Sequence, residues 1–476
     1  MINHFNFKQM GDNLFLVTND FGRSLFLDSI EFSRFLKEDF IQSDPLYHKL
    51  HENYFILEPM ELFSDKVTGQ LRRMKDYVFR ATSLHIFVVT TACNLRCVYC
   101  QAQDERNTHK GLMDASTACK AVDVALQSPA QQLTFEFQGG EPLLNFPVIR
   151  TIVEHTNQHK GDKDIDFTVV SNLSLLTPEI ANFFGENKVT VCTSIDGPES
   201  LHNRNRTAPV STNGSFSFSV SGIELLRKTG FTNIGAIQTT TRYSLPYARE
   251  IVREYLRLGI SGIFLRPLTP LGFASTQWTE IGYTAEEWLE FYRTAFDEIL
   301  KINLSGIFFP EQHASIFLRK ILAGYAENYM ELRSPCGAGV GQLAYYYDGS
   351  VYTCDEARMV SESGNQAFRL GNVFDNSYQD IISSTACRAT CTASLLESIP
   401  GCCDCVYQPY CGVCPVVTYA SEGDLFPSSP HRYRCCVYQG ILDHLFSLLQ
   451  KDDKSIMQVF YSWIGDDSYE GYKERA

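Results

Sequence analysis

The feature that most limits how this sequence can fold is a regular alternation of apolar runs and amphipathic segments between His85 and Leu268. The runs HIFVVTT, TFEFQGG, DFTVVSN, VTVCTSIDG, IGAIQTTT and GIFLRPL are typical of strands, and segments such as MDASTACKAVDVAL, TPEIANFFGENK and PYAREIVREYLRLG are typical of helices. Strands that alternate with helices form a parallel sheet. Six units are too few for a closed eight-stranded barrel. We therefore predict an α/β fold built on a partial (β/α)6 TIM-type barrel with its active face at the carboxyl ends of the strands.

The segments on either side of residues 83–310 predict further domains. Residues 1–82 contain NLFLVTNDFGRSLFL, which indicates two strands around a turn, and then the helix-like DSIEFSRFL and DPLYHKLHENYF, so we expect a small α+β domain. After the barrel, TAEEWLEFYRTAFDEILKIN predicts a long helix. Residues 336–436 then hold eleven of the sixteen cysteines. This change in composition predicts a domain at 311–440 that is held together by metal, followed by a tail at 441–476.

Charge and hydropathy exclude some classes of protein. The chain of 476 residues has a net charge of −14, which disfavours nucleic acid or an anionic membrane as a partner. There is no run of about 18 apolar residues, and the first residues lack the pattern of a signal peptide. We therefore expect a cytoplasmic protein whose cysteines stay reduced and, where they cluster, bind metal.

The first cysteine group is the loop TTACNLRCVYC, which directly follows the first strand of the barrel and contains Cys93, Cys97 and Cys100, here called the loop cysteines. Three thiolates on one loop can bind three irons of a [4Fe–4S] cube and leave the fourth iron open to a small chelating molecule. The alternative is structural zinc, but zinc sites usually have a fourth Cys or His close by.

At this loop the chain resembles the radical S-adenosylmethionine (radical SAM) superfamily, whose cluster motif has the same spacing and an aromatic residue before the last cysteine, here Tyr99. The resemblance implies that S-adenosylmethionine chelates the open iron and that an electron from the cluster cleaves it to methionine and a 5′-deoxyadenosyl radical. The cofactor supplies this chemistry, and the protein must bind, orient and shield it.

Further motifs of the family follow at the expected strand ends. Gln138, Gly139, Gly140 and Glu141 form QGGEP, which is similar to the motif that receives the methionine amino group; its glycines allow close approach and its carboxylate complements an ammonium. Asn172 in VVSNLSLL corresponds to a ribose contact. Ser194 and Arg206 lie in a stretch similar to S-x-D-G-P…R, where Arg206 can bind the carboxylate of S-adenosylmethionine through both nitrogens of its fork. The alternative is a plain turn at Asp196-Gly197-Pro198, with Arg206 as a solvated charge.

The second cysteine group resembles the SPASM extension of peptide-modifying radical enzymes, a domain with two auxiliary [4Fe–4S] clusters. The resemblance implies a distal set, formed by Cys402, Cys405, Cys411 and either Cys435 or Cys436, and a proximal set, formed by Cys336, Cys354 and Cys414. The family usually has three residues where only Gly412 and Val413 stand. Cys387, Cys391 and Cys403 are further candidates for a missing proximal ligand. Structural zinc is the alternative for both sets, and Cys119 and Cys192 are expected to be small core residues.

Stretches such as LVTNDFGRSLFL, TSIDGPESLHNRNR and VYTCDEARM resemble the radical SAM maturases of the His-Xaa-Ser system. The resemblance implies hydrogen abstraction from a ribosomally made precursor peptide, leading to a modification such as a crosslink, with a donor such as flavodoxin or ferredoxin supplying electrons. The resemblance to sulfatase-maturing relatives implies that Asp355, next to Cys354, is a base that takes a proton from the substrate; the alternative is that Asp355 or Glu356 makes a structural ion pair with Arg358. The N-terminal domain either binds a leader peptide, as a winged-helix-like binder does at a sheet edge, or only packs on the barrel. Two other functions stay open: oxidation of a protein Cys or Ser, as by sulfatase-maturing enzymes, and electron transfer without catalysis.

Overall fold

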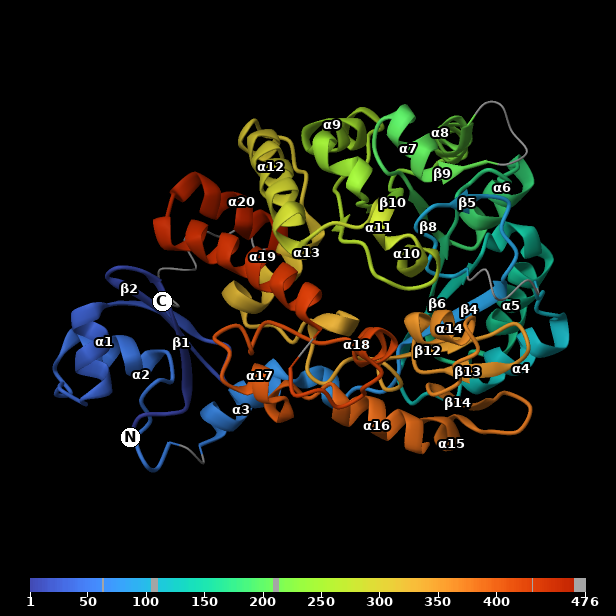
Figure 1. The fold of residues 1–476 in the computed structure, drawn as a ribbon. Coiled ribbons are helices and arrows are strands. Elements are labelled where there is room, and N and C mark those ends of the chain that lie inside the picture. The colour runs from blue at the N-terminus through green and yellow to red at the C-terminus, as the bar shows by residue number, and fades with distance from the viewer. Residues whose placement is uncertain (62–63, 104–109, 209–213, 430, 466–476) are drawn as a thin grey trace.

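The computed structural model describes residues 1–61, 64–103, 110–208, 214–429 and 431–465 (Figure 1). Its centre is a nine-stranded sheet in the order β11-β10-β8-β7-β6-β4-β12-β13-β14. The first six strands in that order are mutually parallel and coincide with the six predicted runs. They are β4 (Leu84–Thr90), β6 (Gln132–Gly139), β7 (Asp164–Val170), β8 (Thr190–Ser194), β10 (Gly235–Thr239) and β11 (Leu265–Arg266). The partial barrel predicted from the alternation is therefore confirmed.

Helices connect the parallel strands and cover the outer side of the sheet (Figure 1). In α4, Asp114 caps the first turn by accepting the Thr117 N–H at 2.7 Å, and Ala118, Ala121 and Val122 are buried. The three segments given as examples of helices form α4, α6 and α9, and α5 and α8 fill two further connections between predicted strands. The bounds are α4 (Ala115–Ala125), α5 (Phe146–His159), α6 (Pro178–Glu186), α7 (Glu199–Asn205), α8 (Gly214–Lys228), α9 (Ala248–Arg257), α10 (Phe273–Thr276) and α11 (Trp278–Ile281).

The sheet continues into the cysteine-rich part of the chain. Strand β12 (Gln342–Tyr345) runs parallel to β4, and β13 (Ser350–Tyr352) and β14 (Arg369–Asn372) extend the sheet in antiparallel fashion. Residues predicted as a separate domain thus share a sheet with the barrel, a pairing that sequence alone did not indicate. The helices of this part are α13 (Gln312–Leu318), α14 (Asp355–Ser361), α15 (Tyr378–Ile382), α16 (Thr385–Ala393), α17 (Pro400–Cys403) and α18 (Pro415–Glu422).

The N-terminal part contains a three-stranded antiparallel sheet of β1 (Phe5–Gly11), β2 (Leu14–Asn19) and β3 (Ser24–Asp28), followed by α1 (Ser29–Leu36), α2 (Pro45–Glu52) and α3 (Asp65–Met74). Strands β2 and β3 are the two predicted strands, and β1 was not foreseen. The sheet packs on the segment that carries the distal cysteines: Asn6 Nδ2 donates to the carbonyls of Cys403 and Cys405 at 3.1 Å each, and Thr18 Oγ1 donates to that of Val406 at 2.6 Å.

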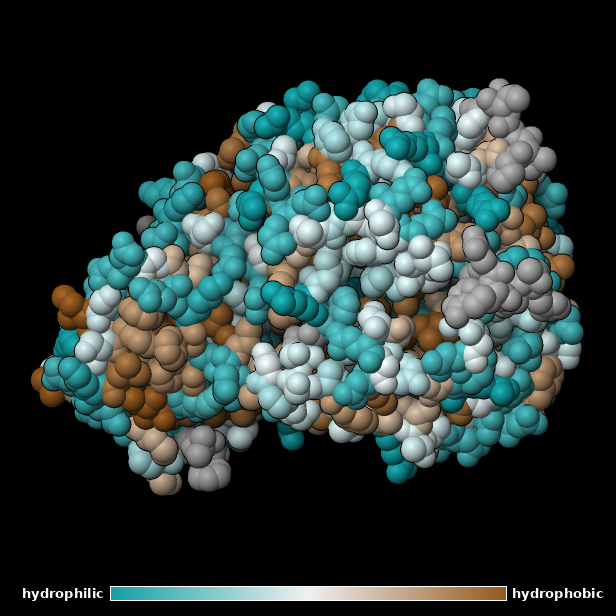
Figure 2. Space-filling view, in the orientation of Figure 1, coloured by the Kyte–Doolittle hydropathy of each residue, from teal (hydrophilic) through white to brown (hydrophobic). Residues whose placement is uncertain are grey.

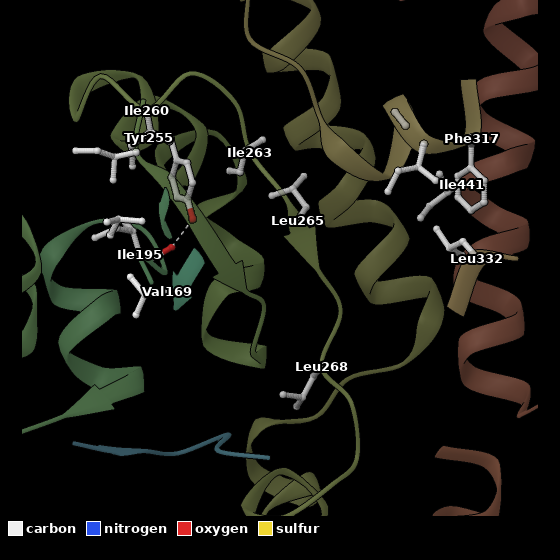
Figure 3. Close-up of a cluster of buried hydrophobic side chains, with 14 of the residues drawn as sticks. Val169, Ile195, Tyr255, Ile260, Ile263, Leu265, Leu268, Phe317, Leu332 and Ile441 are labelled. Carbon is white, nitrogen blue, oxygen red and sulfur yellow. Dashed lines mark hydrogen bonds between the residues drawn. The ribbon is translucent and has the colours of Figure 1, made fainter. Parts of the chain in front are cut away.

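The predicted long helix is α12 (Ala285–Leu304), and α19 (Arg432–Lys451) and α20 (Lys454–Ile464) lie beside it. Helix α19 runs through residue 441, where the sequence suggested the start of a tail. Figure 3 shows buried apolar side chains from the barrel, among them Val169 and Leu265, and others reaching Ile441 on α19; Tyr255 donates its hydroxyl to the Ile195 carbonyl at 2.7 Å. None of the helices in the described part of the chain has the length and apolarity needed to cross a membrane.

Candidate active site

A cleft of about 1020 Å³ opens at the carboxyl ends of the parallel strands. All the residues that the sequence assigned to the first cluster and to S-adenosylmethionine line it: Cys93, Cys97, Tyr99, Cys100, Gln138, Gly139, Gly140, Glu141, Asn172, Ser194 and Arg206. They come from five separate loops and strand ends, which is the arrangement expected of an active site in a barrel of this kind.

The two glycines of QGGEP fit the end of β6 against the backbone that leads into the cysteine loop. A Cβ on Gly139, which has φ +150°, would lie 2.1 Å from the Thr90 carbonyl oxygen, and one on Gly140 would lie 2.2 Å from that of Ala92. The Gly140 and Glu141 amides donate to the same two carbonyls at 2.9 Å. Only glycine allows this approach, so the motif fixes the position of Cys93 in addition to lining the cleft.

Glu141 is 1% exposed and is already hydrogen-bonded within the protein. Its carboxylate accepts the Ser171 hydroxyl at 2.7 Å, the Asn172 amide at 2.9 Å and the Leu143 amide at 3.1 Å. Burial nevertheless raises the pKa of this carboxyl. Glu141 therefore ties the end of β6 to the end of β7, a structural contact that the sequence did not predict, and lines the cleft from there.

Asn172 also supports the cysteine loop. Its Nδ2 donates to Asn94 Oδ1 at 3.0 Å, and its Oδ1 accepts the Ser174 amide at 2.9 Å. Because Asn94 directly follows Cys93, the contact links the β7 end to the loop cysteines.

Arg206 is buried and faces the cysteine loop rather than solvent, which contradicts the alternative of a solvated charge. Strand β9 (Arg206–Thr207) pairs with β5 (Arg96–Cys97), so that Arg206 lies opposite Cys97 with Nη1 3.9 Å from its sulfur. Its Nε is 3.2 Å from Asp196 Oδ1 in an ion pair without hydrogen-bond alignment. Tyr99 donates its hydroxyl to both oxygens of Asp196, at 2.9 and 2.8 Å, and Arg206 lies over its ring.

The chemistry of the loop cysteines fits an iron–sulfur cluster. Burial raises the pKa of the Cys93 thiol to about 12 and raises those of Cys97 and Cys100 as well, so thiolates here need a strong positive partner. Among the described residues, no three Cys, His, Asp or Glu side chains surround one point closely enough to hold a single metal ion. A four-iron cube binds each thiolate to its own iron, so three thiolates on one loop can hold three of its four irons.

The cleft also contains residues that sequence reasoning missed. Arg266, at the end of β11, and Arg358, on α14, line its wall. Arg266 could have been predicted, because it is a polar residue at the end of the last predicted strand. No feature of the neighbouring sequence indicated that Arg358 would line the cleft. Asp355 pairs with Arg358, whose Nε lies 2.7 Å from Asp355 Oδ1. The structural ion pair weighed for Asp355 is therefore present.

The proximal set, Cys336, Cys354 and Cys414, lies in one buried apolar cluster beneath β4 and β12. Burial raises the pKa of Cys354, and Cys414 and Cys336 raise it further, as close neighbours do. Of the further candidates, Cys391 places its sulfur 3.9 Å from the Ala338 carbonyl, and Cys387 contacts Gly339, so both lie beside the segment that follows Cys336.

The distal set lines a second, mostly apolar pocket, and Cys414 of the proximal set lines it as well. Cys402, Cys405, Cys411 and Cys435 all line it, and Cys436, although described, is not among its lining residues. The direction of the α19 side chains therefore favours Cys435 over Cys436. Cys403 turns its sulfur toward the Pro400 carbonyl at 3.4 Å. Cys119 and Cys192, on α4 and β8, lie apart from both sets.

A buried lysine lies next to the distal set. Lys320 is 4% exposed, and its Nζ donates to the carbonyl of Leu332 and, at 2.7 Å, to that of Tyr410. Burial lowers the pKa of Lys320 to about 8, so the side chain is still an ammonium at pH 7.

Comparison with known proteins agrees with this site. Residues 87–247 match the model of the radical SAM superfamily, and they contain all the loop cysteines and the QGGEP motif. This part of the chain is therefore a radical SAM domain, a class that implies S-adenosylmethionine and a [4Fe–4S] cluster.

Among individual proteins, the chain is similar to the serine-type anaerobic sulfatase-maturating enzyme of Bacteroides thetaiotaomicron, with 26% identity over 400 residues, 79% of this chain and 93% of that enzyme. An uncharacterized protein of Methanocaldococcus jannaschii, MJ0907, is 33% identical over 187 residues, which are 39% of this chain and 62% of that protein.

Two solved structures share the fold. The structure of native anSMEcpe with bound AdoMet superimposes with a TM-score of 0.68 at 22% identity and covers 79% of this chain and 100% of that chain. Streptococcus suis SuiB bound to precursor peptide SuiA gives a TM-score of 0.54 at 14% identity over 89% of this chain and 97% of that chain.

Proposed function

We propose that the protein is a radical SAM enzyme that abstracts hydrogen from a residue of a ribosomally made precursor peptide and so modifies that peptide. The supporting observation is that one cleft brings together the three loop cysteines and the predicted contacts of S-adenosylmethionine. When bound there, the cluster and S-adenosylmethionine supply a 5′-deoxyadenosyl radical.

In this proposal, the chain's own residues bind and orient S-adenosylmethionine. Gly139 and Gly140 line the part of the cleft proposed for the methionine end, Arg206 offers its guanidinium to a carboxylate, and Asn172 and Ser194 present polar groups to the ribose. A non-catalytic electron carrier has no need of such a cleft, so the arrangement disfavours that alternative.

Asp355 is our candidate for the base that takes a proton from the substrate. Its side chain is 13% exposed and belongs to α14, whose Arg358 lines the cleft. The ion pair with Arg358 orients the carboxylate and does not preclude this role, because a positioned carboxylate can exchange a proton while paired.

A peptide partner is supported by two observations. SuiB was solved bound to its precursor peptide, and anSMEcpe was solved with a bound Cp18Cys peptide. In this chain, the end of the molecule that holds α1 and α2 displays apolar side chains on its surface (Figure 2), including Phe7, Ile30, Leu36 and Ile41. We propose that the N-terminal sheet, which packs on the distal cysteine segment through Asn6 and Thr18, binds the leader part of the precursor at this exposed surface.

The proximal and distal sets are proposed to hold two auxiliary [4Fe–4S] clusters that pass electrons to or from a donor such as flavodoxin or ferredoxin. Membership of the His-Xaa-Ser maturases is the narrower proposal, and it rests on the stretches of sequence similarity alone.

A second candidate is oxidation of a protein Cys or Ser, as by the sulfatase maturases. The similarity to the Bacteroides enzyme over 79% of this chain favours it. The test uses the reconstituted chain, S-adenosylmethionine and dithionite under anaerobic conditions. One reaction contains the short peptide encoded beside the gene, and a matched one contains a sulfatase-derived Cys or Ser peptide. A mass change in the neighbouring peptide together with 5′-deoxyadenosine supports maturation. Formylglycine in the sulfatase peptide alone would establish the second candidate.

A further inference from the structure

Buried cations lie beside the loop cysteines and the distal set, and two of them, Arg206 and Arg434, have a carboxylate partner. Arg206, beside the loop cysteines, pairs with Asp196. Arg434, which lines the distal cavity, pairs with Glu331 at 2.8 Å. Lys320 differs, because within the described residues no carboxylate lies at ion-pair distance from its Nζ, and its hydrogen bonds go to two carbonyls.

The carboxylates nearest to Lys320 are engaged elsewhere. Glu327 binds Arg319 at 2.5 Å. A cavity of about 770 Å³ adjoins Lys320, and its two acidic lining residues are Asp20, which faces His4 at 3.5 Å, and Glu397, which pairs with Lys75. A buried ammonium without a counter-charge is strongly unfavourable. A negative group near Nζ other than these carboxylates would therefore stabilise the charged side chain, which is 4% exposed.

The geometry identifies that group. Lys320 donates to the carbonyl of Tyr410, the residue directly before Cys411, and Lys320 and Cys411 line the same cavity. Four thiolates around a [4Fe–4S] core leave net negative charge, and one further electron increases it.

We propose that Lys320 is the counter-charge of the distal cluster and raises its reduction potential. An ammonium close to the cluster stabilises the reduced form more than the oxidised form, because the reduced form is more negative. When a donor gives up one electron and the cluster takes it up, no bond is broken, so the effect is purely electrostatic. The inference rests on the proposed assignment of the distal set.

The test is a potentiometric titration of the anaerobically reconstituted full chain with dithionite, followed by electron paramagnetic resonance. The distal signal is identified as the one missing from Cys402→Ala. Lys320→Gln keeps a donor for the two carbonyls but removes the charge, and we expect its distal midpoint potential to shift to more negative values. Lys320→Arg keeps the charge and should restore most of the wild-type potential. Lys75→Gln is the matched control, since Lys75 lines the same cavity but is 41% exposed and already paired with Glu397. The distal midpoint potential of this variant should equal that of the wild type.

Thermal unfolding gives an independent readout. Without iron, the Lys320 charge lacks its partner, so Lys320→Gln should unfold at the same or a higher temperature than the wild-type apoprotein. With iron, the same variant should unfold at a lower temperature than the wild type. If Lys320→Gln holds the full iron content and its distal midpoint potential is unchanged, the proposed role of Lys320 is wrong, but the assignment of the distal cluster is unaffected. A wild-type chain that cleaves S-adenosylmethionine but holds no distal cluster would overturn the distal assignment and, with it, this inference.

Discussion

Replacing Arg206 by Lys tests whether this residue binds S-adenosylmethionine or only supports its neighbours. The guanidinium is 8% exposed and lies between Asp196, whose Oδ1 is 3.2 Å from Nε, and Cys97, whose sulfur is 3.9 Å from Nη1. Lysine keeps a positive charge beside the buried Asp196, so the protein should avoid the loss of about 3–5 kcal/mol that follows removal of one partner from a buried pair. The lysine side chain has a single nitrogen, however. It cannot hydrogen-bond to Asp196 and to a bound carboxylate at the same time in the planar geometry of a guanidinium.

The expected result is therefore weaker binding with an intact fold. The loss of one hydrogen bond to a charged group corresponds to about 1–3 kcal/mol, or roughly a 5- to 150-fold higher Kd for S-adenosylmethionine. The assay is an equilibrium titration of the anaerobically reconstituted protein, with iron content and thermal unfolding measured on the same samples. Arg204→Lys is the control, because Arg204 is exposed, stacks 3.4 Å from the Tyr243 ring centroid and lies only two residues away. An unchanged Kd in Arg206→Lys would show that Arg206 serves only Asp196 and Tyr99.

Four further changes have defined outcomes. Replacing all three loop cysteines by Ala should abolish S-adenosylmethionine cleavage and leave about two of three clusters' worth of iron, measured by iron analysis and by 5′-deoxyadenosine. Gly140→Ala places a Cβ 2.2 Å from the Ala92 carbonyl oxygen, so the cysteine loop must move; we expect about 1–3 kcal/mol of lost stability and loss of cleavage, and retained cleavage would contradict the close-packing argument. Asp355→Asn should keep all clusters and S-adenosylmethionine cleavage but lose most peptide product by mass spectrometry, whereas product at the parent rate would place the base elsewhere. Glu311 is fully buried, and burial raises its pKa from 4.5 to about 7. At about 1.4 kcal/mol per pKa unit, the free energy of unfolding should fall by on the order of 3 kcal/mol as the pH rises from about 4.5 to 7. Glu311→Gln should remove this pH dependence from unfolding curves of the apoprotein.

Strand order and cysteine spacing made the barrel and its first metal loop predictable, because both depend on neighbours in the sequence. Each predicted strand ends in the residues that line the cleft, and parallel strands bring their carboxyl ends together without further information. The extension of the sheet by β12 to β14 was not predictable in this way. The pairing of β12 with β4 joins residues more than 250 positions apart, and both strands are short apolar runs that could pair with many partners.

The sequence did not show which side chains point into the sites, and this explains what it left open about the distal ligand and about Asp355. Cys435 and Cys436 are adjacent, and the rotation of α19 about its axis decides which of them enters the distal cavity. That rotation is set by the packing of α19 on α12, which the cysteine spacing does not report. Asp355 and Arg358 are three positions apart, so one turn of α14 predicts their ion pair, but only the fold shows that Arg358 lines the cleft.

Buried charges mark the limit of the sequence argument most clearly. The motif predicted that Glu141 and Arg206 lie near bound S-adenosylmethionine, and the structure places both in the cleft. It also shows that the protein supplies partners for each of them before any ligand binds, through Ser171 and Asp196. For Lys320 the described residues supply no such carboxylate. A charge that the fold buries without an acidic partner is the observation behind the proposed cluster at Cys411, and this signal exists only in three dimensions.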